Sequence, residues 1–216
     1  MKISPPVRTE RPSRRQFDRT KALDTAMQLF WRHGYEATSM AMLLKAMGLT
    51  APSLYVAFGN KEQLFREAVQ RYGQVYGEKV LAHLSTERPA REAIEQMLLR
   101  SAETVSSTKN PAGCLLSFGA INSADHTSEP AALLRGIRAD VERRIRERLE
   151  RAVKERELPA STDTARLARF YHAMLGGIQL RSLDGATRDE LEAIAHDAME
   201  NWPTSTKPTA RRVFHR

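Results

Sequence analysis

Residues 48–61, GLTAPSLYVAFGNK, form a short apolar segment between two glycines. Leu54 and Phe58 lie four residues apart, so on a helix they share one face that can be pinned to a core. Pro52 is harmless near the start of such a helix, because the first N–H groups have no partner within it. Gly48 can adopt the positive φ that a tight turn requires. The segment therefore predicts a short helix that follows a tight turn.

Helical spacing on the N-terminal side completes a helix-turn-helix module. Apolar residues from Leu23 to Phe30 form one stripe, and Gly34 is expected to end that helix as a left-handed cap. Thr38 is expected to cap the next helix, whose apolar residues also share one face. The predicted module then consists of this second helix over 39–47, the turn 48–50 and the recognition helix 51–58.

The rest of the chain also shows helical spacing and no convincing strand alternation. Asn60 and Gln63 are spaced as a capping box and begin a long helix whose apolar face runs to Val80. The segment 112–121 is almost wholly apolar and predicts a short buried helix. The fold class is therefore predicted to be all-α, with a three-helix helix-turn-helix domain joined by a long helix to a larger helical domain. The remaining helices are expected over 89–105, 130–153, 161–182 and 187–202.

The formal net charge of +8 is concentrated at the two ends of the chain. Residues 1–60 carry +5 and residues 203–216 carry +4, whereas the residues between them sum to −1. A basic end beside a neutral body indicates a polyanionic partner, although a solvated terminus explains residues 1–15 equally well. Candidates for phosphate contacts from an N-terminal arm are Arg14, Arg15, Arg19 and Lys21.

The segment from Phe17 to about Tyr72 resembles the DNA-binding domain of the TetR family of transcriptional regulators. The matching residues read ALDTAMQLFWRHGYEATSM and then GLTAPSLYVAFGNKEQLF. One departure is Ala57, where the family often has histidine, so the contact that this ring makes elsewhere is absent here. A later segment, PAGCLLSFGAIN, is similar to one branch of the family over a short stretch.

This resemblance implies a homodimer that binds a palindromic operator in double-stranded DNA and responds to an unknown small-molecule effector. It implies a DNA-binding domain over 17–74 and a ligand-binding and dimerisation domain over 75–202, whose last two helices usually form the dimer. A flexible basic arm, 1–16, and a disordered basic tail, 203–216, would flank them. The residues that it implies at the DNA are Thr38, Ser39, Thr50, Ala51, Pro52, Ser53, Tyr55, Val56 and Lys61.

Different roles are expected within this set. Lys61 opposes the dipole at a helix start, which a nearby phosphate would explain. Tyr55 is also expected on a phosphate, with packing against the first helix as its alternative, whereas capping alone explains Thr38. Ser53 and Val56 would face base edges. Because such small side chains cannot make bidentate base contacts, part of the specificity is expected to come from DNA shape.

Candidates for a ligand pocket are less specific, because core packing explains them as well as a ligand does. Cys114 is interpreted as a buried, inert thiol rather than a redox sensor, since no cation adjoins it in the sequence. The histidines lack metal-ligand spacing, so neither a metal site nor a cofactor is expected. The pocket candidates are Met97, Cys114, Phe118, Phe170, His172 and Met174.

We therefore expect a DNA-binding regulator and not an enzyme, most simply a repressor that a ligand releases from its operator. The alternative is an all-helical enzyme with a pocket around Cys114 and His172, but no nucleophile elbow or phosphate loop is present. A membrane-surface protein is disfavoured because the basic ends lack an apolar face. No apolar run approaches the roughly 20 residues of a membrane-spanning helix, and no secretory signal is evident, so a cytoplasmic location is expected. The effector, the operator and the sense of regulation stay open.

Overall fold

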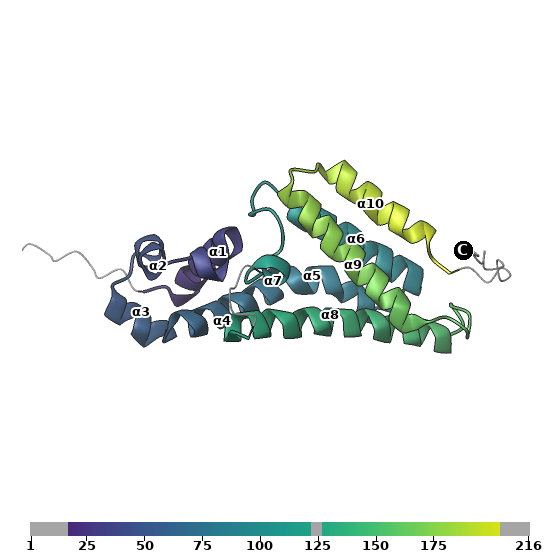
Figure 1. Cartoon of the computed structure of the whole chain (residues 1–216), viewed down its shortest axis with the longest axis horizontal. Coiled ribbons are helices and arrows are strands. Elements are labelled where there is room, and N and C mark those ends of the chain that lie inside the picture. The colour runs from purple at the N-terminus through teal and green to yellow at the C-terminus, as the bar shows by residue number, and fades with distance from the viewer. Residues whose placement is uncertain (1–16, 122–126, 204–216) are drawn as a thin grey trace, which may run out of the picture.

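The computed structural model describes residues 17–121 and 127–203, and within these ranges the chain is helical without strands (Figure 1). The all-α prediction is confirmed. The α-helices are α1 (Arg19–Ala37), α2 (Met40–Met47), α3 (Ala51–Phe58), α4 (Lys61–Tyr72), α5 (Glu78–Leu81), α6 (Ala90–Val105), α7 (Leu115–Phe118), α8 (Glu129–Lys154), α9 (Thr164–Leu183) and α10 (Arg188–Glu200). A π-helical turn, η1 (Gly73–Gly77), and a 3₁₀ turn, η2 (Ala82–Ser85), flank α5.

The first three helices gather at one end of the molecule, and α4 leads from them into the body (Figure 1). Helices α2 and α3 meet at 92°, the angle of a helix-turn-helix pair. Gly48 makes this possible because it adopts a left-handed conformation, with φ 67° and ψ 34°. Leu43 and Leu54 are fully buried beneath the pair. The predicted helix-turn-helix is thus present at the predicted residues.

Two caps differ from the sequence prediction. Ser39, not Thr38, caps α2, because the Ser39 hydroxyl accepts the N–H of Met42. Gly34 adopts a positive φ of 74° as expected, but it kinks α1, which then continues to Ala37. The extra turn carries Thr38 inward, and this shifts the cap of α2 by one residue.

The predicted continuous helix from residue 61 to 80 is interrupted. Asn60 and Gln63 form the expected capping box and start α4. After Tyr72 the chain makes the π-helical turn η1, bounded by Gly73 and Gly77, before α5 resumes. Glycine weakens a helix because it has the largest backbone entropy to lose, so two of them close together favour such an irregularity.

The segment 112–121 also departs from its prediction, since only Leu115–Phe118 is helical. Gly113 has a φ of 74°, which is incompatible with a helix that begins before it. Leu115 is fully buried as expected, whereas Ile121 is 55% exposed. The segment is therefore a short apolar turn with one buried side.

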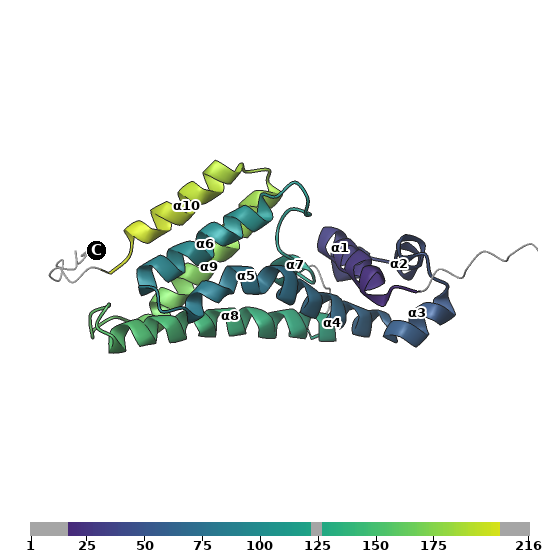
Figure 2. The same cartoon turned by 180° about the vertical axis from the view of Figure 1, so that it is seen from behind.

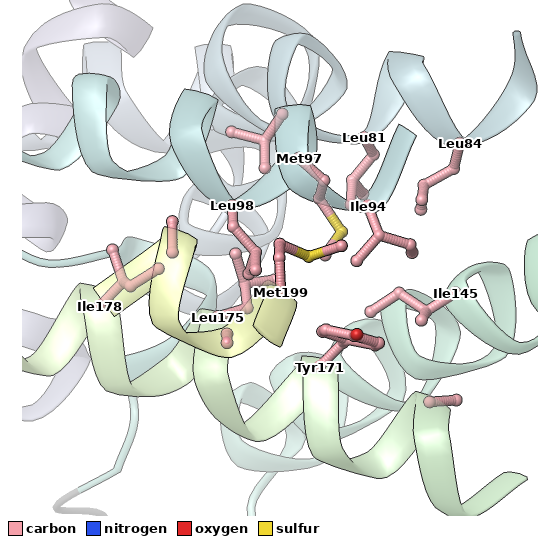
Figure 3. Close-up of a cluster of buried hydrophobic side chains, with 14 of the residues drawn as sticks. Leu81, Leu84, Ile94, Met97, Leu98, Ile145, Tyr171, Leu175, Ile178 and Met199 are labelled. Carbon is pink, nitrogen blue, oxygen red and sulfur yellow. The ribbon is translucent and has the colours of Figure 1, made fainter. Parts of the chain in front are cut away.

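The larger domain packs around α6, α8 and α9. Helix α8 extends along the base of the molecule, and α9 crosses it (Figure 1). Figure 2 shows α10 lying beside α6. Figure 3 shows the core that these helices share, in which side chains of α6 meet those of α8, α9 and α10. Its labelled residues are Leu81, Leu84, Ile94, Met97, Leu98, Ile145, Tyr171, Leu175, Ile178 and Met199.

A second core lies beneath the helix-turn-helix. Phe30 and Phe65 meet edge to face there, with ring centroids 5.0 Å apart. Three residues from much later in the chain, Cys114, Leu115 and Leu134, belong to the same buried cluster. The helix-turn-helix therefore rests on side chains from α7 and the start of α8 as well as on its own.

No single helix of the described ranges is long and apolar enough to cross a membrane. Helices α2 and α3 pass such a test of length and hydropathy only together, as a pair bent by 92°.

Candidate nucleic-acid interface and ligand cavity

Helix α3 has one buried side and one side open to solvent. Leu54 and Phe58 are 0% and 3% exposed and attach the helix to the second core. Tyr55 is 55% exposed and Val56 is 90% exposed, and Ser53 lies on the same open side. An almost wholly exposed valine adds nothing to the core, so this face is available to a partner. The orientation expected from the sequence is confirmed.

The start of α3 is ordered by its own hydroxyl groups. Thr50 caps the helix, accepting the N–H of Ser53 at 3.4 Å, and the hydroxyls of the two residues lie 2.9 Å apart. Pro52 is exposed and Ala51 is half-buried. Ser39 is exposed as well, at the start of α2. Each capping hydroxyl accepts only one N–H of its helix. The other backbone N–H groups in the first turns of α2 and α3 are suited to phosphate oxygens.

Thr38 does not belong with this surface by its side chain. It is 0% exposed, and its hydroxyl donates to the carbonyl of Gly34 at 2.6 Å. The prediction that it caps α2 is wrong, and the buried hydroxyl cannot reach a DNA molecule.

Lys61 has a partner within the chain. Its Nζ lies 4.2 Å from the centre of the Tyr35 ring, a cation–π contact. Burial lowers the pKa of Lys61, against the opposite influence of Glu36. Burial also raises the pKa of Tyr35 to about 12, helped by Glu62 and Glu36. The ring therefore accounts for the position of this lysine without a phosphate.

Arg19 is also committed to the protein. Its guanidinium donates to the carbonyl of Ala57 and to Glu67, and it lies 4.5 Å from the centre of the Phe58 ring. It ties α1 to α3 and α4 and is not free to act as an arm residue. Lys21 is exposed. Arg14 and Arg15 lie outside the described residues, as do segments 1–16 and 204–216.

A mostly apolar cavity of about 330 Å³ lies in the larger domain, between α4, η1, α5, α6, α7, α8 and α9. Cys114, Phe118 and His172 line it, as predicted. The other three candidates do not. Met97 is buried inside the core (Figure 3), and Phe170 and Met174 pack against that core from outside. These three side chains pack in or against the core instead, because only some of the apolar residues of α6 and α9 face the cavity.

Sequence reasoning missed the polar residues of this cavity. Ser101 lies on the apolar face of α6, four residues from both Met97 and Val105, and that break in the apolar spacing was a usable signal. Arg138 gave no signal, since it is one of many arginines on α8. The remaining polar lining residues that were missed are Tyr72, Tyr76, Thr104, Ser117 and Gln179.

In the fold, a cation that is distant in sequence lies near Cys114. The sequence places no cation beside this cysteine, but in the fold Arg138 lies close enough for Cys114 to affect its pKa. Burial is the main cause that lowers the pKa of Arg138, followed by Arg135, and Cys114 opposes them. Burial likewise raises the pKa of Tyr72, whose hydroxyl interacts with Cys114. The thiol is buried and not disulfide-bonded.

The cavity wall touches the helix-turn-helix domain. The N–H of Tyr35 donates to the carbonyl of Gly119 at 2.7 Å, directly after α7. The indole of Trp31 donates to the carbonyl of Gly113 at 3.2 Å, and its ring meets that of Tyr72, with centroids 4.7 Å apart. Helix α1 therefore contacts the same short segment that closes the cavity.

Within the described ranges, no group of three or more His, Cys, Asp or Glu side chains is arranged to hold a metal ion.

Two sequence models of protein families match the chain. The one described as "Bacterial regulatory proteins, tetR family" matches residues 22–68, and the one described as "Tetracyclin repressor-like, C-terminal domain" matches residues 89–200. The HTH-type transcriptional repressor ComR of Escherichia coli (strain K12) is 35% identical over 202 residues, which are 93% of this chain and 96% of ComR. The uncharacterized HTH-type transcriptional regulator YezE of Bacillus subtilis (strain 168) is 29% identical over 159 residues, 73% and 82% of the two chains.

Solved structures agree with these matches. A cysteine mutant of the TetR family transcriptional regulator CifR, complexed with 26-bp double-strand operator DNA, superposes with a TM-score of 0.84. Its identity is 36%, and the match covers 90% of this chain and 100% of CifR. The reduced form of E. coli NemR, at 21% identity and a TM-score of 0.70, covers 83% of this chain and 94% of NemR and bears on the fold alone.

Proposed function

The chain belongs to the TetR family of bacterial regulatory proteins and is a DNA-binding transcriptional regulator, and we propose that it is a homodimeric repressor released from its operator by a small molecule. The observation that carries the DNA-binding role is the exposed side of α3, which leads from a glycine turn and bears Tyr55 and Val56. The repressor role is supported by the likeness to ComR, a transcriptional repressor.

Within the module, we assign base contacts to Ser53 and Val56 and phosphate contacts to Tyr55. Ser53 and Val56 are three residues apart and share a helix face, whereas Tyr55 lies to its side. The N–H groups at the starts of α2 and α3, near Ser39 and Thr50, are suited to further phosphates. Lys61 can add a phosphate contact because its ammonium is only partly covered by the Tyr35 ring.

Two copies of the module are needed to read a palindrome. Recognition helices that enter successive major grooves on one side of DNA lie about 34–36 Å apart. We assign the dimer contact to α9 and α10, because Leu180 and Leu183 are half exposed on α9. In this arrangement the larger domains set the distance between the two copies of α3.

Release follows from the position of the cavity. The segment around α7 lines the cavity and also binds α1 through the Tyr35–Gly119 hydrogen bond. A ligand that prefers a different arrangement of this segment shifts the dimer away from the DNA-binding spacing. The size of the shift is set by its difference in affinity for the two states.

Selection of bound duplexes from a random pool tests the proposal. A palindrome with half-sites one helical turn apart, or a multiple of it, is the expected product. The exposed variant Val56→Glu should abolish enrichment, because it places a negative charge against DNA without disturbing the core. Ala160→Glu adds the same charge to an exposed residue of the loop that joins α8 to α9, and this loop lies at the opposite end of the molecule from α3 (Figure 1), so enrichment should stay intact. An unenriched wild-type pool, or an asymmetric single site, would overturn the homodimeric repressor.

A further inference from the structure

The cavity has an unbalanced set of charged side chains. Arg138 and His172 line it, whereas none of its described lining residues is Asp or Glu. His172 has a carboxylate neighbour outside the lining, since its Nδ1 lies 3.3 Å from Glu142. Arg138 has no acidic partner in the described ranges. A guanidinium that faces an apolar cavity without a counter-ion favours an anionic ligand.

The hydrogen bonds of Arg138 leave part of the guanidinium unused. Its Nη1 donates to the carbonyls of Leu116 and Ser117, at 3.2 and 3.3 Å. A guanidinium carries five N–H donors, so, among the residues that the structure describes, Nε and Nη2 remain for a ligand. A planar carboxylate matches that fork, because its two oxygens can accept two parallel N–H groups.

Ser101 gives an independent indication that the cavity receives a ligand. Its residue is 1% exposed, and its hydroxyl has no hydrogen-bond partner in the described part of the chain. Buried hydroxyls are usually paired, so an unpaired one on a cavity wall indicates a missing partner. Gln179 lines the same cavity, and its amide oxygen already accepts from Ser117 at 2.5 Å.

Most of the remaining lining surface is apolar, which favours a ligand with one charged group and an apolar body. The volume of about 330 Å³ lies at the lower end of small-molecule sites, roughly 300–1,000 Å³. The apolar side chains that surround it include Val80, Leu81, Val105, Ile137, Val141 and Leu175.

We propose that the effector is a small carboxylic acid with an apolar body, bound in this cavity with its carboxylate on Arg138. The proposal rests on the proposed function only in naming this cavity as the effector site. The carboxylate oxygens accept from Nε and Nη2, while Nη1 keeps the carbonyls of Leu116 and Ser117. Binding is therefore coupled through Arg138 to α7, and the segment around α7 also contacts α1.

The first experiment compares acids with neutral amides of the same shape, without DNA. Phenylacetate and phenylacetamide form one pair, and octanoate and octanamide form another. Isothermal titration calorimetry of the full chain at neutral pH measures both. In at least one pair the acid should bind about tenfold or more tightly than its amide, which is the size of one hydrogen bond between charged groups.

Three variants assign that preference to Arg138. Arg138→Met removes the charge at similar length and should make acid and amide bind alike. Arg146→Met removes an exposed cation from the same helix, outside the cavity, and should keep the preference. Ser101→Ala removes the unpaired hydroxyl without changing the charge of the cavity, so it should weaken acid and amide by a similar factor and keep their ratio. If Arg138→Met does not fold, the comparison in the wild-type chain still decides the outcome.

Acid and amide that bind equally in both pairs, or that both fail to bind, overturn the proposal. So does an acid preference that survives in Arg138→Met. These results leave the repressor proposal intact, because that proposal is tested by duplex selection without any ligand. Conversely, a chain that binds acids through Arg138 but selects no duplex retains the anion site and loses the repressor role.

Discussion

At the scale of single residues, the roles proposed for the exposed side chains of α3 predict two kinds of effect on DNA binding. Ser53→Ala and Val56→Ala should each change preference at one or two operator positions, by about 1–3 kcal/mol, because they remove contacts to base edges. Tyr55→Phe should weaken all sequences together by about 1–3 kcal/mol, the contribution of a hydrogen bond to a charged group. Binding of each variant to a set of single-base operator substitutions measures both effects.

The three variants should melt like the wild-type chain, because their altered groups lie on the exposed face of α3. A uniform loss for Ser53→Ala and Val56→Ala, or an altered base preference for Tyr55→Phe, would show that the roles are assigned wrongly.

Lys61 poses a different question, because the Tyr35 ring already accounts for its position. If it also touches phosphate, Lys61→Ala should reduce the slope of log affinity against log salt by about one per half-site. Lys154→Ala removes an exposed lysine at the end of α8 and serves as the control. The salt dependence of operator binding distinguishes the two contacts, and an unchanged slope in Lys61→Ala would leave the ring as its sole partner.

At the scale of helices, the sequence was most informative where a local signal coincided with the packing. Asn60 and Gln63 form a capping box because both partners lie within one turn. The predicted cap of α2 is wrong by one residue, because both Thr38 and Ser39 can cap a helix and the continuation of α1 beyond Gly34 leaves Ser39 at the cap position. For the π-helical turn η1, the sequence offers no indication of an interrupted helix other than Gly73 and Gly77.

Gly34 is a position within α1 where a side chain would be strained. Gly34→Ala should lower the free energy of unfolding by about 1–2 kcal/mol, because an L-residue at φ 74° is strained and its Cβ would lie 3.2 Å from the carbonyl oxygen of Gly119. Gly136→Ala is the matched control, since a Cβ there meets nothing within 4 Å and alanine favours the middle of α8. Chemical denaturation of both should show opposite signs, and equal stability would contradict the strain at Gly34.

The end of α8 is joined to the start of α6 by a charge network. Glu157 accepts from Arg148 Nη2 at 2.9 Å and from the N–H of Ala90. Burial alone would raise the pKa of Glu157, but these two donors outweigh it and hold the pKa below its ordinary 4.5. The stabilisation is therefore complete above pH 4.5 and is lost as the pH falls through the lower folded pKa.

Glu157→Gln should then lower the free energy of unfolding at neutral pH by roughly 1–3 kcal/mol, because the buried guanidinium of Arg148 loses its counter-ion. Denaturation curves of both proteins measured from pH 7 downward should converge in acid. A gap that is constant with pH would show that the charge of Glu157 is not the cause.

At the scale of the whole molecule, the proposed dimer depends on α9 and α10. Light scattering at micromolar concentration should return about twice the 24.4 kDa of the chain. Leu180→Glu should yield monomers, because it places charge within an apolar contact, and operator affinity should fall with it. Arg181 is a neighbouring exposed residue that pairs with Asp184 at the end of the same helix. Arg181→Glu therefore tests whether any added negative charge at this end of α9 is enough to break the dimer. A monomeric wild-type chain that still binds a palindrome tightly would contradict the dimer.

The sequence predicts which side chains of α3 are exposed better than it predicts the cavity, for a geometric reason. Ser53, Tyr55 and Val56 lie within one short helix, where spacing alone decides which side each faces. The cavity takes its walls from six separate α-helices, so Arg138 and Ser101 line the same cavity only after folding. Exchangeable apolar residues such as Met97 could not be divided between wall and core beforehand.

The second core has a consequence for how such proteins diversify. Because Cys114, Leu115 and Leu134 are buried together with the helix-turn-helix, a recombination point near residue 74 would separate side chains that pack on one another. In a chimaera that joins this helix-turn-helix domain to the larger domain of another protein, the side chains buried beneath α1 would not match in volume. Substitutions on the exposed surface of α3 leave this shared core intact, whereas an exchange of whole domains does not. An engineered chimaera should therefore transfer residues 114–121 and the start of α8 together with the helix-turn-helix domain.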